Sequence, residues 1–196
     1  MTAKSYFASE ARGYDTRLRS GMLGILREAE RRTVIYLLSP KKGEQILDIP
    51  CGSGYYADFL KKAGAEIYGI DISAEMITVF QEKKYHGQTG DMKSFSLARQ
   101  FDKVLSAGGF EFCLDQEKII KNLLAHTKEK GEIVVLFPRK SLFGQMYKLY
   151  HLLFHKTKIM LFSEEQIASW FQINGGKVRE LKRAALFTSV MVVEKL

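Results

Sequence analysis

The sequence predicts an α/β protein with a doubly wound, mostly parallel sheet of seven strands, N-terminal helices and a helical lid. Two observations lead to this fold class. Between residues 45 and 137, short β-branched runs alternate with helical patterns, and this alternation is typical of parallel sheets covered by helices on both faces. Two final runs, residues 177–184 and 188–194, are only a few residues apart and should form an antiparallel hairpin at the sheet edge.

The N-terminal segment, residues 5–38, is expected to be helical because apolar side chains recur at helical spacing. These positions are Leu18, Met22, Ile25, Leu26 and Ala29. Pro40 and Gly43 end the segment. We expect residues 1–40 to form a helical cap on a single domain that spans residues 1–196.

The alternating part of the chain is divided by its turn residues. We expect strands at residues 45–49, 66–71, 89–92, 101–106 and 132–137, and helices at residues 55–63, 73–84 and 115–128. Gly64 should end the first of these helices as a C-terminal cap. The strand at residues 89–92 is the weakest, because the chain around it is short and polar.

The segment of residues 139–162 differs in composition from the rest of the chain. It carries five of the eight net positive charges and no acidic residue; the basic residues are Arg139, Lys140, Lys148, Lys156 and Lys158. Leu142, Met146, Leu149, Tyr150 and Leu153 fall at helical spacing, with Gly144, Lys148, His151 and His155 on the other side. Either the apolar face covers the core, or the segment is a basic lid over a substrate. A capping box, Ser163 to Gln166, should then begin a helix that ends at residues 174–176.

Composition excludes several classes of protein. With only Cys51 and Cys113, the chain has no disulfide framework or zinc-ligand spacing, and no metal is expected. We see no signal peptide and no apolar run of membrane-spanning length, and therefore expect a cytoplasmic protein. The net charge of +8 leaves open a nucleic acid, an anionic membrane surface or an acidic small molecule as partner.

The loop after the first strand is the main candidate for ligand binding. Gly52 and Gly54 follow the strand and, with Asp71 further along, loosely fit a dinucleotide-binding pattern. Asp48 opposes that interpretation, because its carboxylate would meet a pyrophosphate of like charge but would attract a cationic sulfonium or ammonium group. The alternative is that Asp48 only caps the next turn.

Five blocks in order resemble the motifs of class I S-adenosylmethionine (SAM)-dependent methyltransferases of the small-molecule type. They are LDIPCGSG at residues 47–54, GIDIS at 69–73, GDM at 90–92, FDKVLSAGGFEF at 101–112 and KEKGEIVVLFP at 128–138. Pro50 stands where the first motif usually has Gly. The resemblance implies a Rossmann-like methyltransferase fold with SAM as cofactor.

The resemblance also implies which residues contact SAM. They are Asp48, Pro50, Gly52, Ser53, Gly54, Asp71, Ile72, Met76, Asp91, Met92, Ser106, Ala107 and Tyr14. Asp71 should accept hydrogen bonds from both ribose hydroxyls, and Ile72 and Met76 should pack on the adenine ring. Asp91 should accept from the adenine amino group, unless it is an ordinary turn residue beside Gly90.

Methyl transfer needs a general base only when the acceptor must lose a proton, so no catalytic residue is assigned. The candidates are His151, Tyr147 and Glu111. We expect methyl transfer by in-line displacement to a small, anionic or partly hydrophobic metabolite, with a membrane-surface contact of the basic lid left open. The alternatives are an RNA methyltransferase, for which no RNA-binding appendage is visible, and a non-catalytic SAM-binding protein. A nicotinamide-dependent dehydrogenase is opposed by Asp48 and by the lack of a Tyr-x-x-x-Lys pair.

Overall fold

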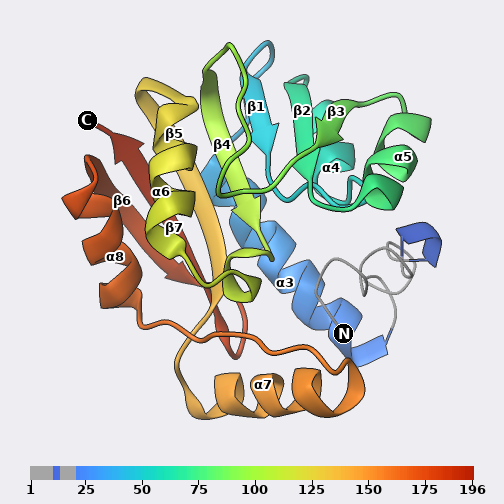
Figure 1. Cartoon of the computed structure of the whole chain (residues 1–196), viewed down its shortest axis with the longest axis vertical. Coiled ribbons are helices and arrows are strands. Elements are labelled where there is room, and N and C mark those ends of the chain that lie inside the picture. The colour runs from blue at the N-terminus through green and yellow to red at the C-terminus, as the bar shows by residue number, and fades with distance from the viewer. Residues whose placement is uncertain (1–10, 14–20) are drawn as a thin grey trace.

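The computed structural model describes residues 11–13 and 21–196, and one sheet organises them. Its strands lie in the order β3-β2-β1-β4-β5-β7-β6 (Figure 1). Their bounds are β1 Gln45–Asp48, β2 Glu66–Asp71, β3 His86–Thr89, β4 Phe101–Ala107, β5 Thr127–Pro138, β6 Gly176–Arg183 and β7 Thr188–Lys195. Strands β1 to β5 are parallel, whereas β7 pairs antiparallel with both β5 and β6. The predicted fold class and the terminal hairpin are confirmed.

Helices cover both faces of the sheet. The bounds are η1 Ala11–Gly13, α3 Gly21–Leu38, α4 Ala57–Lys62, α5 Ala74–Glu82, η2 Phe110–Phe112, α6 Gln116–Ala125, α7 Leu142–Phe154 and α8 Glu164–Ile173. Buried residues of α3 and α4 pack on one face, while those of α6 and α8 pack on the other. Residues of α5 join α4 in a third cluster. The α8 capping box of Ser163 and Gln166 is present as predicted.

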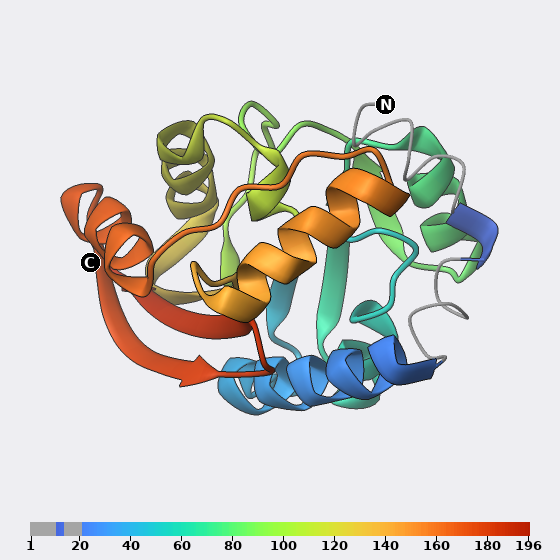
Figure 2. The same cartoon turned by 90° about the horizontal axis from the view of Figure 1, so that it is seen from below.

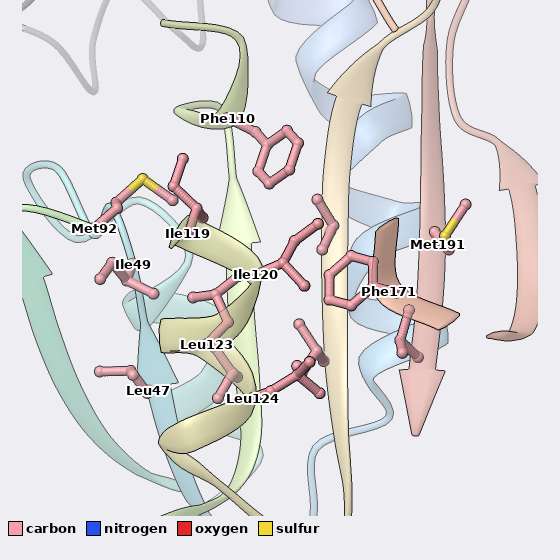
Figure 3. Packing of buried hydrophobic residues seen from close by; sticks show 14 of the residues in the cluster. Leu47, Ile49, Met92, Phe110, Ile119, Ile120, Leu123, Leu124, Phe171 and Met191 are labelled. Atoms are coloured by element: carbon pink, nitrogen blue, oxygen red, sulfur yellow. The ribbon is translucent and has the colours of Figure 1, made fainter. Parts of the chain in front are cut away.

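The strands divide their side chains between these two faces because successive residues point to opposite sides. Ile46 packs with α3, whereas its neighbour Leu47 packs with α6. Figure 3 shows the apolar residues of α6 turned toward the strands, with Phe171 of α8 beside them. Each such buried side chain contributes ~1.5–3 kcal/mol, so this packing holds the strand ends in fixed positions.

Several boundaries differ from the prediction. Strand β3 occupies residues 86–89 instead of 89–92, and its pairing with β2 ends where the Gly90 N–H donates to the Asp71 carbonyl at 2.8 Å. Helix α6 ends before His126, whose ring accepts a hydrogen bond from the Leu97 N–H, and β5 starts directly afterwards. Helix α4 begins at Ala57 instead of residue 55.

The N-terminal helix is confirmed for residues 21–38, but its predicted apolar face is partly wrong. Ile25 is 72% exposed, and the core face instead contains Val34, Leu37 and Leu38. Leu18 lies outside the described residues, as does Tyr14.

Helix α7 lies within the predicted segment, but the prediction that its apolar side covers the core is wrong. Leu142, Met146, Leu149 and Leu153 are 76%, 60%, 54% and 62% exposed, so they do not cover the core. Lys148 is also exposed. The side turned toward the sheet instead carries Gly144 and His151, both buried. Gly144 is essential there, because a Cβ would lie 2.1 Å from the Arg139 carbonyl oxygen.

Candidate cofactor and acceptor site

The site lies at the carboxyl ends of the parallel strands β1, β2 and β4, which together form one edge of the sheet, across the strands. The register places Asp48 beside Gly69 of β2 and Leu105 of β4. Helix α7 crosses below this edge (Figure 1), and the view from below in Figure 2 shows it in front of the strand ends. In doubly wound sheets, the carboxyl ends of the strands are where ligands bind.

Asp48, the last residue of β1, is 1% exposed, and neither of its carboxylate oxygens has a hydrogen-bond partner among the described residues. It therefore does not cap the turn that follows. Burial, and secondly the negative charge of Asp71, raise the pKa of Asp48 well above its usual value. Among the described residues, the Ser106 Oγ and the Glu111 Oε2 are also buried without a hydrogen-bond partner. Such groups cost free energy unless a ligand or water pairs with them, so they fit a polar, cationic ligand.

The glycine-rich turn joins Asp48 to Asp71. Gly52 and Gly54 have φ values of 51° and 90°, a region that favours glycine. The Gly52 N–H donates to one oxygen of Asp71, and the Ser73 N–H donates to the other, both at 2.9 Å. Burial raises the pKa of Asp71, and these two backbone donors oppose the rise. Each carboxylate oxygen keeps a lone pair for a further donor, which is what ribose hydroxyls would require.

Pro50 shapes the site by contact with the loop after β4. A Cβ on Gly109 would lie only 2.4 Å from the Pro50 Cγ, so glycine is needed for the two loops to meet. Ala107 ends β4 just before this contact. Ser53, in the turn itself, is buried. Pro50 therefore fixes how the β1 and β4 loops meet beside Asp48.

The residues predicted to lie near the adenine ring differ in how far they are buried. Met76 and Met92 are buried, whereas Ile72 is partly exposed. Asp91 Oδ1 accepts from the Lys93 N–H at 2.9 Å, and Oδ2 lies 3.5 Å from the Lys93 ammonium. Asp91 thus stabilises its own turn, as the alternative interpretation requires, and its contact with adenine stays a prediction.

A polar cluster that the sequence analysis missed lies beside α7. Arg27 of α3 donates to Glu30 at 2.8 Å and to the Tyr147 hydroxyl at 3.2 Å. The Thr188 hydroxyl donates to Glu30 at 2.9 Å. Glu30 is 1% exposed and lies one helical turn before Val34, on the core face of α3. A charged residue on that face was the signal that could have revealed this cluster.

Glu111 faces the same cluster from η2. Burial raises its pKa to about 7, while the charge of Arg27 opposes the rise. The Met160 N–H donates to the Glu111 carbonyl at 2.8 Å, which connects η2 to the segment between α7 and α8. The structure therefore brings two of the three catalytic candidates, Glu111 and Tyr147, to the same charged neighbours.

His151, the third candidate, has a structural environment. Its Nδ1 lies 3.1 Å from the Thr157 hydroxyl, and its ring meets that of Tyr147 edge-on at 4.6 Å. Burial lowers the pKa of His151 to about 4, so the ring is neutral near pH 7. Tyr147 in turn stacks on Phe187 at 4.4 Å between ring centroids. These aromatic contacts fasten α7 to the rest of the protein.

Comparison with known proteins agrees with this arrangement. The methyltransferase domain family matches residues 22–181. The chain belongs to this family. The predicted class I SAM-dependent methyltransferase resemblance is thus confirmed, and SAM is the cofactor that the family uses. Within the described residues, no group of three or more His, Cys, Asp or Glu is arranged to hold a metal ion. No described helix is long and apolar enough to cross a membrane.

Individual relatives are more distant. A demethylmenaquinone methyltransferase from Thermotoga maritima is 29% identical over 129 residues, which cover 61% of this chain and 56% of that protein. A ubiquinone biosynthesis O-methyltransferase from Albidiferax ferrireducens is 27% identical over 50% of this chain and 36% of its own length. The chain thus spans about half or less of these relatives. The solved structure of magnesium protoporphyrin IX methyltransferase from Synechocystis, with bound S-adenosylhomocysteine, covers 98% of both chains at 19% identity and a TM-score of 0.78; this likeness shows the fold.

Proposed function

We propose that this chain transfers the methyl group of SAM to a small, anionic or partly hydrophobic metabolite. The observation that carries the proposal is the carboxylate of Asp48, buried at the end of β1 with no partner among the described residues for either oxygen. The ammonium and sulfonium groups of SAM would supply the positive charge that such a carboxylate requires. The names of the relatives, which refer to quinones and a porphyrin, support a partly hydrophobic acceptor.

SAM supplies an activated methyl group, and the residues of the chain bind it and align the acceptor. Asp48 would hold the cationic amino-acid end, the turn of Gly52 and Gly54 would allow close backbone approach, and Asp71 would accept from the ribose hydroxyls. The acceptor atom attacks the methyl carbon as the carbon–sulfur bond breaks, and the bonding pair returns to sulfur, which becomes a neutral thioether. Positioning of the acceptor ~3 Å from the methyl carbon can supply most of the acceleration.

Glu111 is the strongest candidate for a general base when the acceptor carries a proton. Its pKa of about 7 is well matched to accepting a proton near neutral pH. Tyr147 is less suited, because burial raises its pKa to about 12 and its hydroxyl accepts a hydrogen bond from Arg27. His151 is engaged with Thr157. We therefore propose Glu111 as base and Tyr147 as a group that orients the acceptor.

The proposal treats residues 1–196 as one SAM-binding domain. Residues 1–40 would form the cap, and residues 139–162 would form a lid over the acceptor. The position of α7 across the ends of the strands supports this (Figure 2). We also propose, independently of methyl transfer, that this basic segment contacts a membrane surface. The RNA alternative is tested by the same binding experiment.

The test is isothermal titration of SAM, NAD and a single-stranded RNA into the purified chain and its Asp71→Ala variant. We expect SAM to bind, and NAD and RNA not to compete with it. The variant should lose ~10–150-fold in SAM affinity, because hydrogen bonds to a charged acceptor contribute ~1.5–3 kcal/mol. Asp58→Asn, on the outer side of α4 where Asp58 accepts from the Tyr85 hydroxyl at 3.0 Å, is the matched control. Tighter binding of NAD than of SAM, or unchanged SAM affinity in folded Asp71→Ala, would contradict the proposal.

A further inference from the structure

Helix α7 presents an apolar stripe to the outside of the molecule. Leu142, Met146, Leu149 and Leu153 are spaced by four, three and four residues, so they follow one side of the helix. Phe143 and Phe154 lie at its two ends, and all six side chains are at least 47% exposed. We call these six residues the α7 outer face. Exposed apolar side chains are common singly, but a continuous stripe indicates an interaction surface.

The orientation of this stripe is fixed by contacts on the opposite side of the helix. Tyr147 stacks on Phe187, His151 pairs with Thr157, and buried Gly144 lies against the Arg139 carbonyl. Helix α6 has the usual arrangement, with its apolar residues inside and charged residues such as Lys121 outside. Because α7 reverses this arrangement, rotation of its apolar stripe inward would break all three of these contacts.

Exposed basic residues lie on α7 and just before and after it in the chain. Lys140, Lys148, Lys156 and Lys158 are all exposed. The chain has no acidic residue from Pro138 to Ser163. An apolar helical face bordered by lysines matches the chemistry of an anionic bilayer, whose acyl chains accept the apolar residues and whose headgroups attract the lysines.

A second copy of the chain is a poorer match to this surface. In a two-fold dimer the same patch meets itself. The lysines along and beside α7 would then approach those of the other copy, with no carboxylate in the segment to balance them. Such like-charge contacts oppose association.

We propose that the α7 outer face docks the protein onto an anionic lipid bilayer, with the helix lying in the plane of the headgroups. The helix, 13 residues and roughly 20 Å long, would lie in this interface without crossing it. This docking surface deepens the proposed function. It rests on that function for one point, that the acceptor enters at the strand ends that lie next to the bilayer. These strand ends lie directly above α7 in Figure 1.

The test is flotation of the purified full chain with vesicles of phosphatidylcholine and phosphatidylglycerol in equal parts, compared with pure phosphatidylcholine. We expect binding to the anionic vesicles alone, and loss of that binding at high salt. Lys148→Gln with Lys156→Gln should weaken binding by about 25-fold, since each lysine near the surface contributes about fivefold. Leu149→Gln with Leu153→Gln should weaken it at least tenfold.

Matched controls remove the same groups from other surfaces. Leu114→Gln with Ile173→Gln removes two side chains that are 89% and 77% exposed outside α7, and Lys118→Gln with Lys121→Gln removes two lysines of α6. These controls should bind vesicles like the parent chain. Equal losses in the controls and the α7 variants, or undiminished binding of the α7 variants, would overturn the proposal.

Sedimentation without lipid tests whether a second copy of the chain, instead of a bilayer, covers the α7 outer face. A dimer that Leu149→Gln with Leu153→Gln converts to monomer would show that a second copy covers the face, and would overturn the proposal. Titration with SAM keeps the two proposals distinct. Vesicle binding without SAM binding would refute the proposed function and leave the docking surface, whereas SAM binding without vesicle binding would refute the docking surface.

Discussion

Replacement of Glu111 by Gln should change how the stability of the protein depends on pH. Glu111 is 5% exposed, and its Oε2 has no hydrogen-bond partner among the described residues. Burial raises the pKa of this carboxyl from 4.5 to about 7. The folded chain therefore holds a proton that the unfolded chain has released throughout that interval.

The magnitude follows from this difference in bound protons. Below pH 4.5 both states are protonated and Glu111 costs nothing, but above it the free energy of unfolding falls by ~1.4 kcal/mol per pH unit. Across the interval to about pH 7 the loss reaches roughly 3 kcal/mol, after which it is constant. Glutamine carries no titrating proton, so Glu111→Gln should recover this free energy and stabilise the chain most above pH 7.

His151 should act in the opposite direction. Burial lowers its pKa from 6.5 to about 4, so between these values the unfolded chain binds a proton that the folded chain excludes. Its contribution to the unfolding free energy therefore rises with pH, by ~1.4 kcal/mol per unit. Over the shared interval the two slopes cancel, and Glu111→Gln should uncover the rising contribution of His151.

The assay is urea denaturation followed by circular dichroism, without SAM, at pH values on both sides of these intervals. The quantity to compare is the difference in unfolding free energy between variant and parent, because the other titrating groups cancel in it. Glu117→Gln, at a carboxylate that is 61% exposed on α6, is the control for replacement of an acid by an amide. A pH-independent difference for Glu111→Gln would refute the assignment of a raised pKa to Glu111.

Three further predictions concern packing and the cofactor. Asp48→Asn should stabilise the SAM-free chain by ~1–3 kcal/mol, because it removes a buried carboxylate without partners, yet lower SAM affinity in calorimetry. Leu149→Ala, on the exposed side of α7, should change the unfolding free energy by less than ~0.5 kcal/mol, whereas Leu123→Ala, in the α6 core, should lower it by ~2–5 kcal/mol; similar losses would mean that α7 packs inward. Gly109→Ala should cost ~1–3 kcal/mol in denaturation and weaken SAM binding, because its Cβ would collide with Pro50, and a neutral result would show that the two loops can separate.

Much of the fold follows from local patterns in the sequence. The order of strands and helices was predictable because each element carries its own period and turn residues, such as Gly64 with φ of 83° after α4. The edge of the sheet that holds Asp48 and Asp71 was also predictable, because the carboxyl ends of parallel strands meet at one edge. The boundaries of the elements were harder to predict. The His126 ring, directly after α6, accepts a hydrogen bond from the N–H of Leu97, which is 29 residues away in the chain.

The acceptor side could not be predicted, because long-range contacts build it. Arg27 reaches Tyr147 across 120 residues, and Thr188 reaches Glu30 across 158. Each side chain alone has an ordinary local interpretation, a charge on a helix or a hydroxyl in a strand. Their meeting depends on how α3 and α7 are placed by the sheet, which no short motif encodes.

The orientation of α7 marks the limit of periodicity as a guide. Helical spacing of Leu142, Met146, Leu149 and Leu153 indicates that one side is apolar, but the step from apolar to inward assumes that the protein core is the only apolar surroundings available. In α7 the opposite side is satisfied by aromatic stacking and by the hydrogen bond of His151, so the helix is fastened without its leucines. If a bilayer covers the α7 outer face, the periodicity rule holds after all, because the apolar stripe then faces lipid in place of the core. The vesicle experiment therefore tests whether the apolar stripe of α7 faces lipid, as well as whether the protein binds a bilayer.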